Sequence, residues 1–173
     1  MSVFRLDKLL SNLGYDSRKG AAIIVKLGRV SVDGEILKNP AHKVDPEIQE
    51  IYLDGEELDL PPPLTVALNK PEGVICDNDP GQANIFEYLP HLWRLRNPGF
   101  KCAGRLDKES HGLVILSEDG QIIHQLISPG GETPKTYIVK SAAPLTVEDL
   151  TLFENGGMIL KGEDKPLKPV KCR

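Results

Sequence analysis

Apolar residues recur at helical spacing near the start of the chain. Four leucines in residues 6–13 repeat every three or four positions before Gly14, which predicts a short amphipathic helix that ends at the glycine. Ser17 can cap a second helix that runs to Gly28. Residues 30–37 then alternate around an Asp-Gly pair, a strong hairpin signal. The pattern predicts a small module of two helices and a hairpin.

A boundary is expected directly after this module. Residues 51–58 alternate around a second Asp-Gly pair and predict another short hairpin. The three prolines at 61–63 can continue neither a sheet nor a helix. We therefore divide the chain into one domain at 1–60 and another at 61–173.

The second domain mixes strands and helices without regular alternation. This order is typical of an α+β fold with a mixed, mainly antiparallel sheet. The predicted strands are 64–68, 74–76, 113–116, 137–140 and 158–160, with a turn at 70–73. The predicted helical segments are a turn around Phe86 and Leu89, residues 121–128 with Ile122, Ile123, Leu126 and Ile127 facing inward, and a helix capped by Thr146 and Asp149 that ends at Phe153.

Charge is distributed unevenly along the chain. The formal net charge of −4 argues, for the chain as a whole, against a nucleic-acid binder. Residues 1–43 nevertheless carry a charge of +4, residues 44–60 a charge of −7, and the remainder a charge of −1. A basic excess is therefore confined to the N-terminal module.

Cysteine usage and hydropathy indicate a cytoplasmic protein. The three cysteines are far apart and lack the close pairs of a zinc site or a redox motif, so a reducing compartment is expected. The charged N-terminus and the lack of an apolar run of about 20 residues predict neither export nor a membrane span.

Residues 103–117 carry the strongest chemical signal. Glycines and charged residues there lead into the apolar run 113–116, which predicts a strand apolar on both faces that lies inside a sheet. Arg105 lies near enough in sequence to keep the carboxylate of Asp107 ionised, and an ionised carboxylate can act as a nucleophile or a base. From spacing alone, however, an Arg-x-Asp pair in a loop is more often a structural ion pair or a turn cap.

Two further motifs accompany this segment and complete a pattern of one enzyme family. The family carries Lys-Pro-x-Gly, then Gly-Arg-Leu-Asp followed by Ser/Thr-x-Gly-Leu, then Lys-x-Tyr-x-Val. The matching positions are Lys70, Pro71 and Gly73, then Gly104 to Asp107 with Ser110, Gly112 and Leu113, then Lys135, Tyr137 and Val139. From residue 3 onward the chain resembles the bacterial ribosomal RNA pseudouridine synthases of the RsuA type. Members of this family continue past the end of this sequence, so we expect an incomplete catalytic domain.

The resemblance implies roles for several residues. Asp107 is the catalytic carboxylate, Arg105 helps to hold the flipped-out RNA and to orient this acid, and Tyr137 stacks on the target base. Without the resemblance, Tyr137 is interpreted as a core residue of a strand. Lys70 and Pro71 shape a turn that supports Tyr137. Isomerising uridine needs neither a metal nor a redox cofactor.

The N-terminal module resembles the alpha-L RNA-binding domain that precedes the catalytic domain in such synthases. From spacing alone, Arg18 and Lys19 in the first turn of a helix are more often a solvated pair. The resemblance favours contacts to the RNA backbone, which position RNA without reading its sequence. The candidate contacts are Arg5, Lys8, Arg18, Lys19, Lys26 and Arg29.

The leading hypothesis is a cytoplasmic, monomeric pseudouridine synthase that acts on one uridine of ribosomal RNA or of a pre-ribosomal particle. The incomplete catalytic domain keeps a second hypothesis open, which is a noncatalytic or truncated RNA-binding protein with an incomplete site. A third is a ribosome-associated assembly factor that uses the same N-terminal module.

Overall fold

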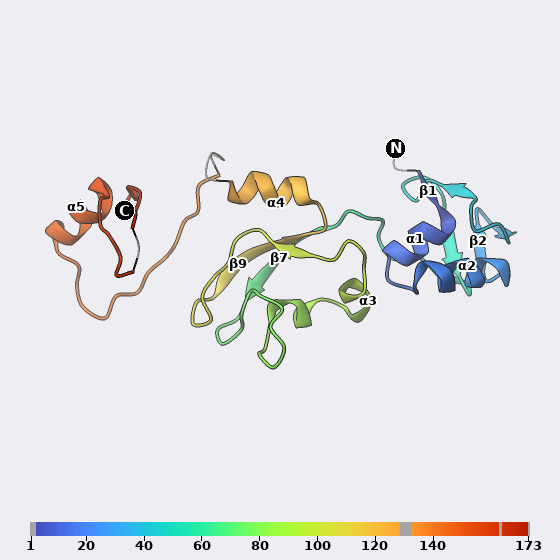
Figure 1. Cartoon of the computed structure of the whole chain (residues 1–173), viewed down its shortest axis with the longest axis horizontal. Coiled ribbons are helices and arrows are strands. Elements are labelled where there is room, and N and C mark those ends of the chain that lie inside the picture. The colour runs from blue at the N-terminus through green and yellow to red at the C-terminus, as the bar shows by residue number, and fades with distance from the viewer. Residues whose placement is uncertain (1–2, 129–132, 163, 173) are drawn as a thin grey trace. The chain divides into compact units, whose positions relative to one another are not determined.

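The computed structural model describes residues 3–128, 133–162 and 164–172. The chain forms two compact units, Met1–Thr133 and Pro134–Arg173, which we describe separately (Figure 1). The first unit contains an N-terminal module (residues 4–58) and a sheet domain (residues 64–128). No helix of the described residues is long and apolar enough to cross a membrane.

The N-terminal module packs two helices against short antiparallel strands, as predicted. The four leucines of the first helix are at most 1% exposed and form its core together with apolar residues of the second helix and of the strands. Ser17 caps the second helix, because its side chain accepts a hydrogen bond from the Gly20 amide at 3.2 Å. Both Asp-Gly hairpins are confirmed. The elements are β1 (Phe4–Arg5), α1 (Leu6–Asn12), α2 (Arg18–Lys26), β2 (Val30–Val32), β3 (Glu35–Leu37), β4 (Lys43–Val44), β5 (Ile51–Leu53) and β6 (Glu56–Glu57), in sheets β1-β4 and β3-β2-β5-β6.

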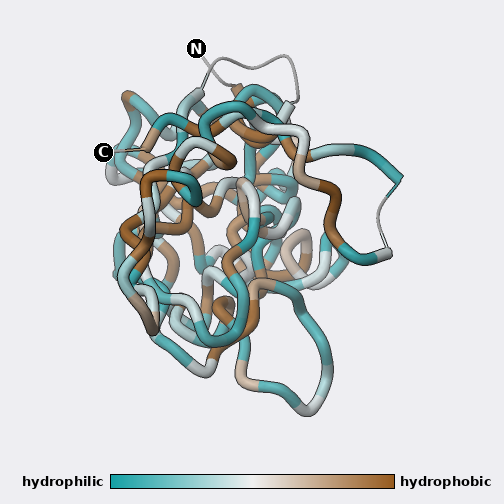
Figure 2. The backbone as a smooth tube through the Cα atoms, turned by 90° about the vertical axis from the view of Figure 1, so that its left-hand side faces the viewer, coloured by the Kyte–Doolittle hydropathy of each residue, from teal (hydrophilic) through white to brown (hydrophobic). Residues whose placement is uncertain are grey.

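The sheet domain is built on a three-stranded antiparallel sheet in the order β7-β9-β8. Its central strand contains the apolar run predicted to lie inside a sheet. Only one face of that run is buried at its start, because Val114 is buried whereas Leu113 is 70% exposed. The elements are β7 (Thr65–Lys70), the 3₁₀ helix η1 (Ile85–Tyr88), α3 (His91–Arg94), β8 (Lys101–Cys102), β9 (Gly112–Ser117) and α4 (Gly120–Ile127). Figure 2 shows apolar and polar stretches alternating along the backbone of the chain.

Two predictions in the sheet domain are wrong. Residues 74–76 do not return as a strand beside β7, and Ile75 forms only an isolated parallel bridge to Asn84. The reason is that β7 pairs along its whole length with β9, more than forty residues later in the chain. In α4, only Ile123 of the four residues expected to face inward is buried.

Among its described residues, the second unit contains one regular element, α5 (Val147–Asn155). Thr146 caps this helix in a reciprocal capping box with Asp149, as predicted. The strands predicted at 137–140 and 158–160 are wrong, because neither segment pairs into a sheet among the described residues. In the part of the chain that the structure describes, the alternating side chains of 137–140 have no neighbouring strand, and Tyr137 is 65% exposed.

An ion pair stabilises the start of α1. Asp7 is buried and accepts hydrogen bonds from Arg5 Nε at 3.1 Å and from Arg5 Nη2 at 2.7 Å. Arg18 Nη2 lies 3.8 Å from the same carboxylate. The hydrogen bond from Arg5 holds the pKa of Asp7 below its ordinary value, against the opposing effect of burial.

Replacing Asp7 with Asn is expected to make the protein less stable in a pH-dependent way. At pH 7 the loss is about 1–3 kcal/mol in the free energy of unfolding, because a charge-assisted pair is removed. The lowered pKa of folded Asp7 means that its stabilisation is complete above the unfolded value of about 3.9 and is lost as the pH falls through the folded value. Urea unfolding between pH 7 and pH 2.5 will show the difference from wild type narrowing below about pH 4.

Glu35→Gln is the control, since Glu35 is an exposed carboxylate of the same module. It is expected to change the free energy of unfolding by less than about 0.5 kcal/mol at any pH. A difference between Asp7→Asn and wild type that stays constant over the whole pH range would contradict the assignment.

Candidate active site

Asp107 lies in the loop that connects β8 to β9. Its side chain is exposed, and its carbonyl accepts a hydrogen bond from the Ser110 amide at 3.0 Å, which closes a tight turn. The loop begins where Ala103 donates to the carbonyl of Ile115 at 2.8 Å. The carboxylate therefore stands at the entrance of the central strand, on a backbone that the sheet supports.

A buried lysine supports this loop through hydrogen bonds to backbone carbonyls. Lys70, the last residue of β7, is fully buried, and its Nζ donates to the carbonyls of Pro71 at 3.0 Å, Val74 at 2.5 Å and Lys108 at 3.3 Å. The Gly73 amide also donates to the Lys108 carbonyl, at 2.7 Å. The turn that Lys70 and Pro71 shape was expected to support Tyr137. In the structure it supports the residue that follows Asp107.

Cys76 supports the other side of the loop. Its buried Sγ accepts a hydrogen bond from the Leu106 amide at 3.4 Å, and its carbonyl accepts one from Cys102 Sγ at 3.3 Å. Burial, reinforced by Cys76, raises the pKa of Cys102 to about 12, so this thiol is neutral at pH 7. No motif of the sequence predicted this structural role. The only signal for it is the position of Cys76 at the end of the apolar run that follows the Lys-Pro-x-Gly motif.

Arg105 pairs with Asp77. Its Nη1 lies 2.7 Å from Asp77 Oδ2, and both side chains are more than half exposed. Among the described residues Arg105 forms no ion pair with Asp107, so the Arg-x-Asp segment is not a structural ion pair of these two residues. An exposed pair of this kind contributes at most about 1 kcal/mol, and an anionic ligand can displace it. The guanidinium is therefore accessible beside the loop.

Tyr137 belongs to the second unit and is more than half exposed. The alternative interpretation as a core tyrosine of a strand is wrong, since this segment is neither buried nor a strand. An exposed aromatic ring is available for stacking. Its association with Asp107 stays a prediction.

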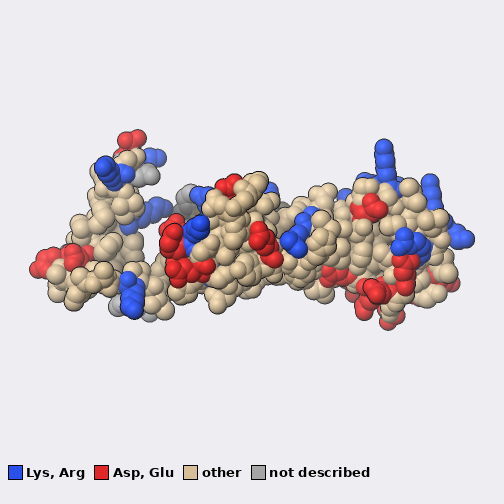
Figure 3. Space-filling view, turned by 90° about the horizontal axis from the view of Figure 1, so that it is seen from below, with Lys and Arg blue, Asp and Glu red and all other residues tan. Residues whose placement is uncertain are grey.

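The candidate RNA contacts of the N-terminal module form separate groups. Arg5 and Arg18 converge on Asp7. Arg29 instead binds Asp54, with Nε 2.9 Å from Oδ1, so the acidic segment 44–60 neutralises part of the basic excess. The candidate lysines are Lys8, Lys19 and Lys26, and all three are exposed. Figure 3 shows Lys and Arg side chains projecting from this module, with acidic side chains close by.

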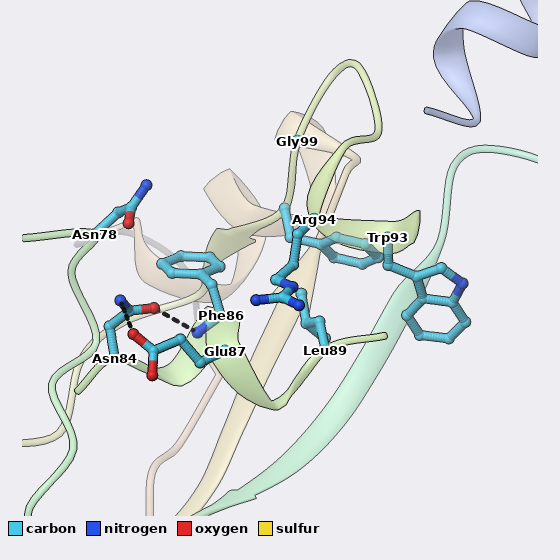
Figure 4. Close-up of a pocket in the computed structure, with 9 residues that line it drawn as sticks. Asn78, Asn84, Phe86, Glu87, Leu89, Trp93, Arg94 and Gly99 are labelled. Carbon is cyan, nitrogen blue, oxygen red and sulfur yellow. Dashed lines mark hydrogen bonds between the residues drawn. The ribbon is translucent and has the colours of Figure 1, made fainter. Parts of the chain in front are cut away.

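A hollow of ≈ 400 Å³ lies in the sheet domain, and its lining residues are not among the predicted site residues (Figure 4). Phe86, Trp93 and Phe100 contribute three rings to its walls, and the last two stack with centroids 5.9 Å apart. The side-chain amide of Asn84 donates a hydrogen bond from Nδ2 to Glu87 Oε1 at 3.0 Å. Residues 77–101 carried no regular pattern in the sequence, which is why this hollow was not expected.

Replacing Lys70 with Met is expected to destabilise the protein by about 2–4 kcal/mol, because buried carbonyls lose their donor. Amide exchange at Gly73, whose N–H shares the Lys108 carbonyl with Lys70, is expected to accelerate. Urea unfolding and hydrogen exchange measure the two effects. Lys108→Met is the matched control, since that side chain is exposed, and it is expected to stay within about 0.5 kcal/mol of wild type. Equal effects of the two substitutions would contradict a supporting role for Lys70.

Two family models match the chain. The model described as RNA pseudouridylate synthase matches residues 65–164 and so includes the sheet domain and the loop that carries Asp107. The model of the S4 domain matches residues 4–47 in the N-terminal module.

Relatives and a solved structure agree with these matches. An uncharacterized RNA pseudouridine synthase of Bacillus subtilis is 39% identical over 165 residues, which are 95% of this chain and 69% of that protein. The ribosomal small subunit pseudouridine synthase A of Haemophilus influenzae is 36% identical over 96% of this chain and 71% of its own length. A crystal structure of a pseudouridylate synthase superimposes with a TM-score of 0.53 at 32% identity, covering 96% of this chain and 70% of the other. The chain therefore belongs to the RNA pseudouridylate synthase family and carries an S4 domain at its N-terminus.

Proposed function

We propose that this chain isomerises a uridine of ribosomal RNA to pseudouridine and that Asp107 is the catalytic carboxylate. The observation that carries the proposal is the way the loop is held. The backbone is fixed at Leu106 by Cys76 and at Lys108 by Lys70 and Gly73, while the carboxylate between them is exposed. A rigid backbone with an exposed acid suits a group that must meet a substrate in one orientation.

The reaction moves the bond between ribose and base from N1 to C5 of the uracil. The glycosidic bond breaks, the base turns, the new carbon–carbon bond forms, and the C5 proton leaves while N1 gains a proton. The product is an isomer of the substrate, so no oxidant, reductant or group donor is consumed. Asp107 acts at the ribose, either as a nucleophile or as a base.

The target uridine has to leave its stack to reach an acid on a protein surface. We assign Arg105 to the RNA beside the flipped nucleotide, because its exposed pair with Asp77 can exchange for a phosphate. We assign Tyr137 to stacking on the base. Its exposure supports this role, and the Lys-x-Tyr-x-Val motif in which it lies matches that of the family.

We further assign residues 1–60 to RNA binding and 61–173 to catalysis. The S4 match at 4–47 and the synthase match at 65–164 support this division. The partner is then ribosomal RNA, free or in a pre-ribosomal particle, and the protein acts as a monomer in the cytoplasm. The name of the Haemophilus influenzae relative supports ribosomal RNA as the substrate class.

Replacing Asp107 with Asn is expected to abolish pseudouridine formation, with a loss of at least about a thousandfold in rate. Unmodified ribosomal RNA is incubated with each protein, and new pseudouridines are mapped as carbodiimide-dependent primer stops. Glu109→Gln is the matched control, since Glu109 is an exposed carboxylate in the same loop, and it is expected to retain activity. If the wild-type chain produces no new stop, the proposed catalytic activity is contradicted, and the hypothesis of a noncatalytic RNA-binding protein remains.

Replacing Arg18 and Lys19 with Ala is expected to weaken RNA binding and to reduce the slope of log affinity against log salt by about one to two. The physical reason is the loss of two cations that release counterions from the RNA. Affinity is measured by filter binding between 50 and 300 mM KCl. The matched control is Lys38→Ala with Lys43→Ala, two exposed lysines of the same module outside the candidate set. An equal change of slope in both double variants would remove the special role of Arg18 and Lys19.

A further inference from the structure

We propose that Arg96 is a positioning residue that locks the N-terminal module to the sheet domain, and thereby selects which uridine reaches Asp107. Both parts lie in the first unit, and the residues that join them come from α1, the connection 59–64, α3 and the end of β9. This inference rests on the proposed function, because it concerns how the RNA-binding module directs the RNA to the catalytic loop.

Arg96 is the centre of the joint. Its side chain is fully buried, and its Nε donates to Glu118 Oε1 at 2.6 Å. Nη1 and Nη2 both donate to the carbonyl of Leu60 at 3.0 Å, and Nη1 lies 3.7 Å from Asp59 Oδ2. One guanidinium therefore holds the connection between the module and the sheet domain as well as the residue that follows β9.

The far end of the connection is tied to the same ion pair. Glu118 Oε2 accepts from the Leu64 amide at 2.7 Å, and the Glu118 amide donates to the Leu64 carbonyl at 3.0 Å. The segment 59–64 is consequently fixed at both ends by the Arg96–Glu118 pair. The three prolines of this segment would by themselves only stiffen the linker. The hydrogen bonds at both ends also fix its position, so the connection is a rigid spacer.

Three further hydrogen bonds link the connection, the N-terminal module and the sheet domain. Asp59 Oδ2 accepts from Trp93 Nε1 at 2.5 Å, and the Asp59 amide donates to the hydroxyl of Tyr15 at 3.1 Å. The Asn97 amide donates to the carbonyl of Asn12, at the end of α1, at 2.9 Å. Residues from both sides of the connection thus bind each other directly.

Backbone packing also brings the two parts together. A Cβ at Gly14 would lie 2.8 Å from the carbonyl oxygen of Leu92, and Gly14 has a φ of +89°. The end of α1 therefore approaches α3 at a distance that only glycine permits. This close contact lies beside the hydrogen bond between Asn97 and Asn12.

The chemistry of the joint makes it a single state rather than one of several. A buried guanidinium is tolerated only while its polar partners remain in place, so a rotation of the module that displaced Leu60 would leave Arg96 without its carbonyl acceptor in the interior. RNA bound by the module is then presented to Asp107 in one geometry. A rigid connection keeps the loop that carries Asp107 close to one nucleotide of the bound RNA. A flexible connection would let the loop reach the neighbouring nucleotides as well.

Arg96→Met with Glu118→Gln tests the joint while retaining side-chain volume and an acceptor for the Leu64 amide. Asp59→Ala with Trp93→Phe is a milder second variant that leaves the Arg96–Glu118 pair intact. Arg94→Met is the matched control, since Arg94 is exposed and lies two residues before Arg96 in the chain. Far-UV circular dichroism checks that each variant is folded.

Amide ¹⁵N relaxation of the full chain measures the coupling without reference to activity. We expect one rotational correlation time for the N-terminal module and the sheet domain in wild type and in Arg94→Met, and a shorter time for the module in both joint variants. The single tryptophan of the chain gives one indole N–H signal, which is expected to be protected from exchange in wild type. A wild-type module that already tumbles independently would overturn the proposal.

Activity then tests the functional consequence. On a long ribosomal RNA fragment the joint variants are expected to lose about tenfold in kcat/KM and to modify uridines next to the target, while a short hairpin with only the target shows an unchanged kcat/KM. An equal loss on both RNAs would overturn the selection role. If the wild-type protein is inactive on both RNAs, the proposed function is contradicted instead. The relaxation result would still decide whether the joint is rigid.

Discussion

A buried positive charge organises the loop that carries Asp107. Lys70 is removed from water, and oxygen atoms of Pro71, Val74 and Lys108 take the place of its hydration. An ammonium group is stable in the interior only with such partners, so the turn after β7 and the loop before β9 must both close around it. These acceptors are backbone carbonyls, so they do not engage the carboxylate of Asp107, which is exposed.

The same physical rule acts at Arg96, with a different result. There the buried cation is matched by the carboxylate of Glu118 and by the carbonyl of Leu60, so it fixes two segments that are far apart in the sequence. Buried cations in this protein hold backbone in place, whereas exposed ones such as Arg105 and Lys19 are accessible to RNA. Burial therefore separates the structural positive charges from those that we propose to contact RNA.

Local patterns predicted most of the secondary structure. The helices of the N-terminal module, the Ser17 cap, both Asp-Gly hairpins and the Thr146 capping box depend on neighbours within a few residues, and all are confirmed. The prediction of a strand at 74–76 is wrong because it assumed that β7 forms a hairpin with the next apolar segment of the chain. In the structure β7 pairs with β9 instead. The prediction of a strand at 137–140 is wrong for a related reason. Alternating apolar and polar residues form a strand only where a second strand is available for pairing.

The sequence by itself determined the family, the α+β class and the place of Asp107 in a loop before an apolar strand, because motifs and periodicity are properties of consecutive residues. Tertiary structure decided the partners. It paired Arg105 with Asp77, placed Lys70 under Lys108, and joined Arg96 to Glu118. These contacts link residues from 22 to 38 positions apart. Such distances are closed by packing and by the need to pair buried charge, which no local pattern encodes.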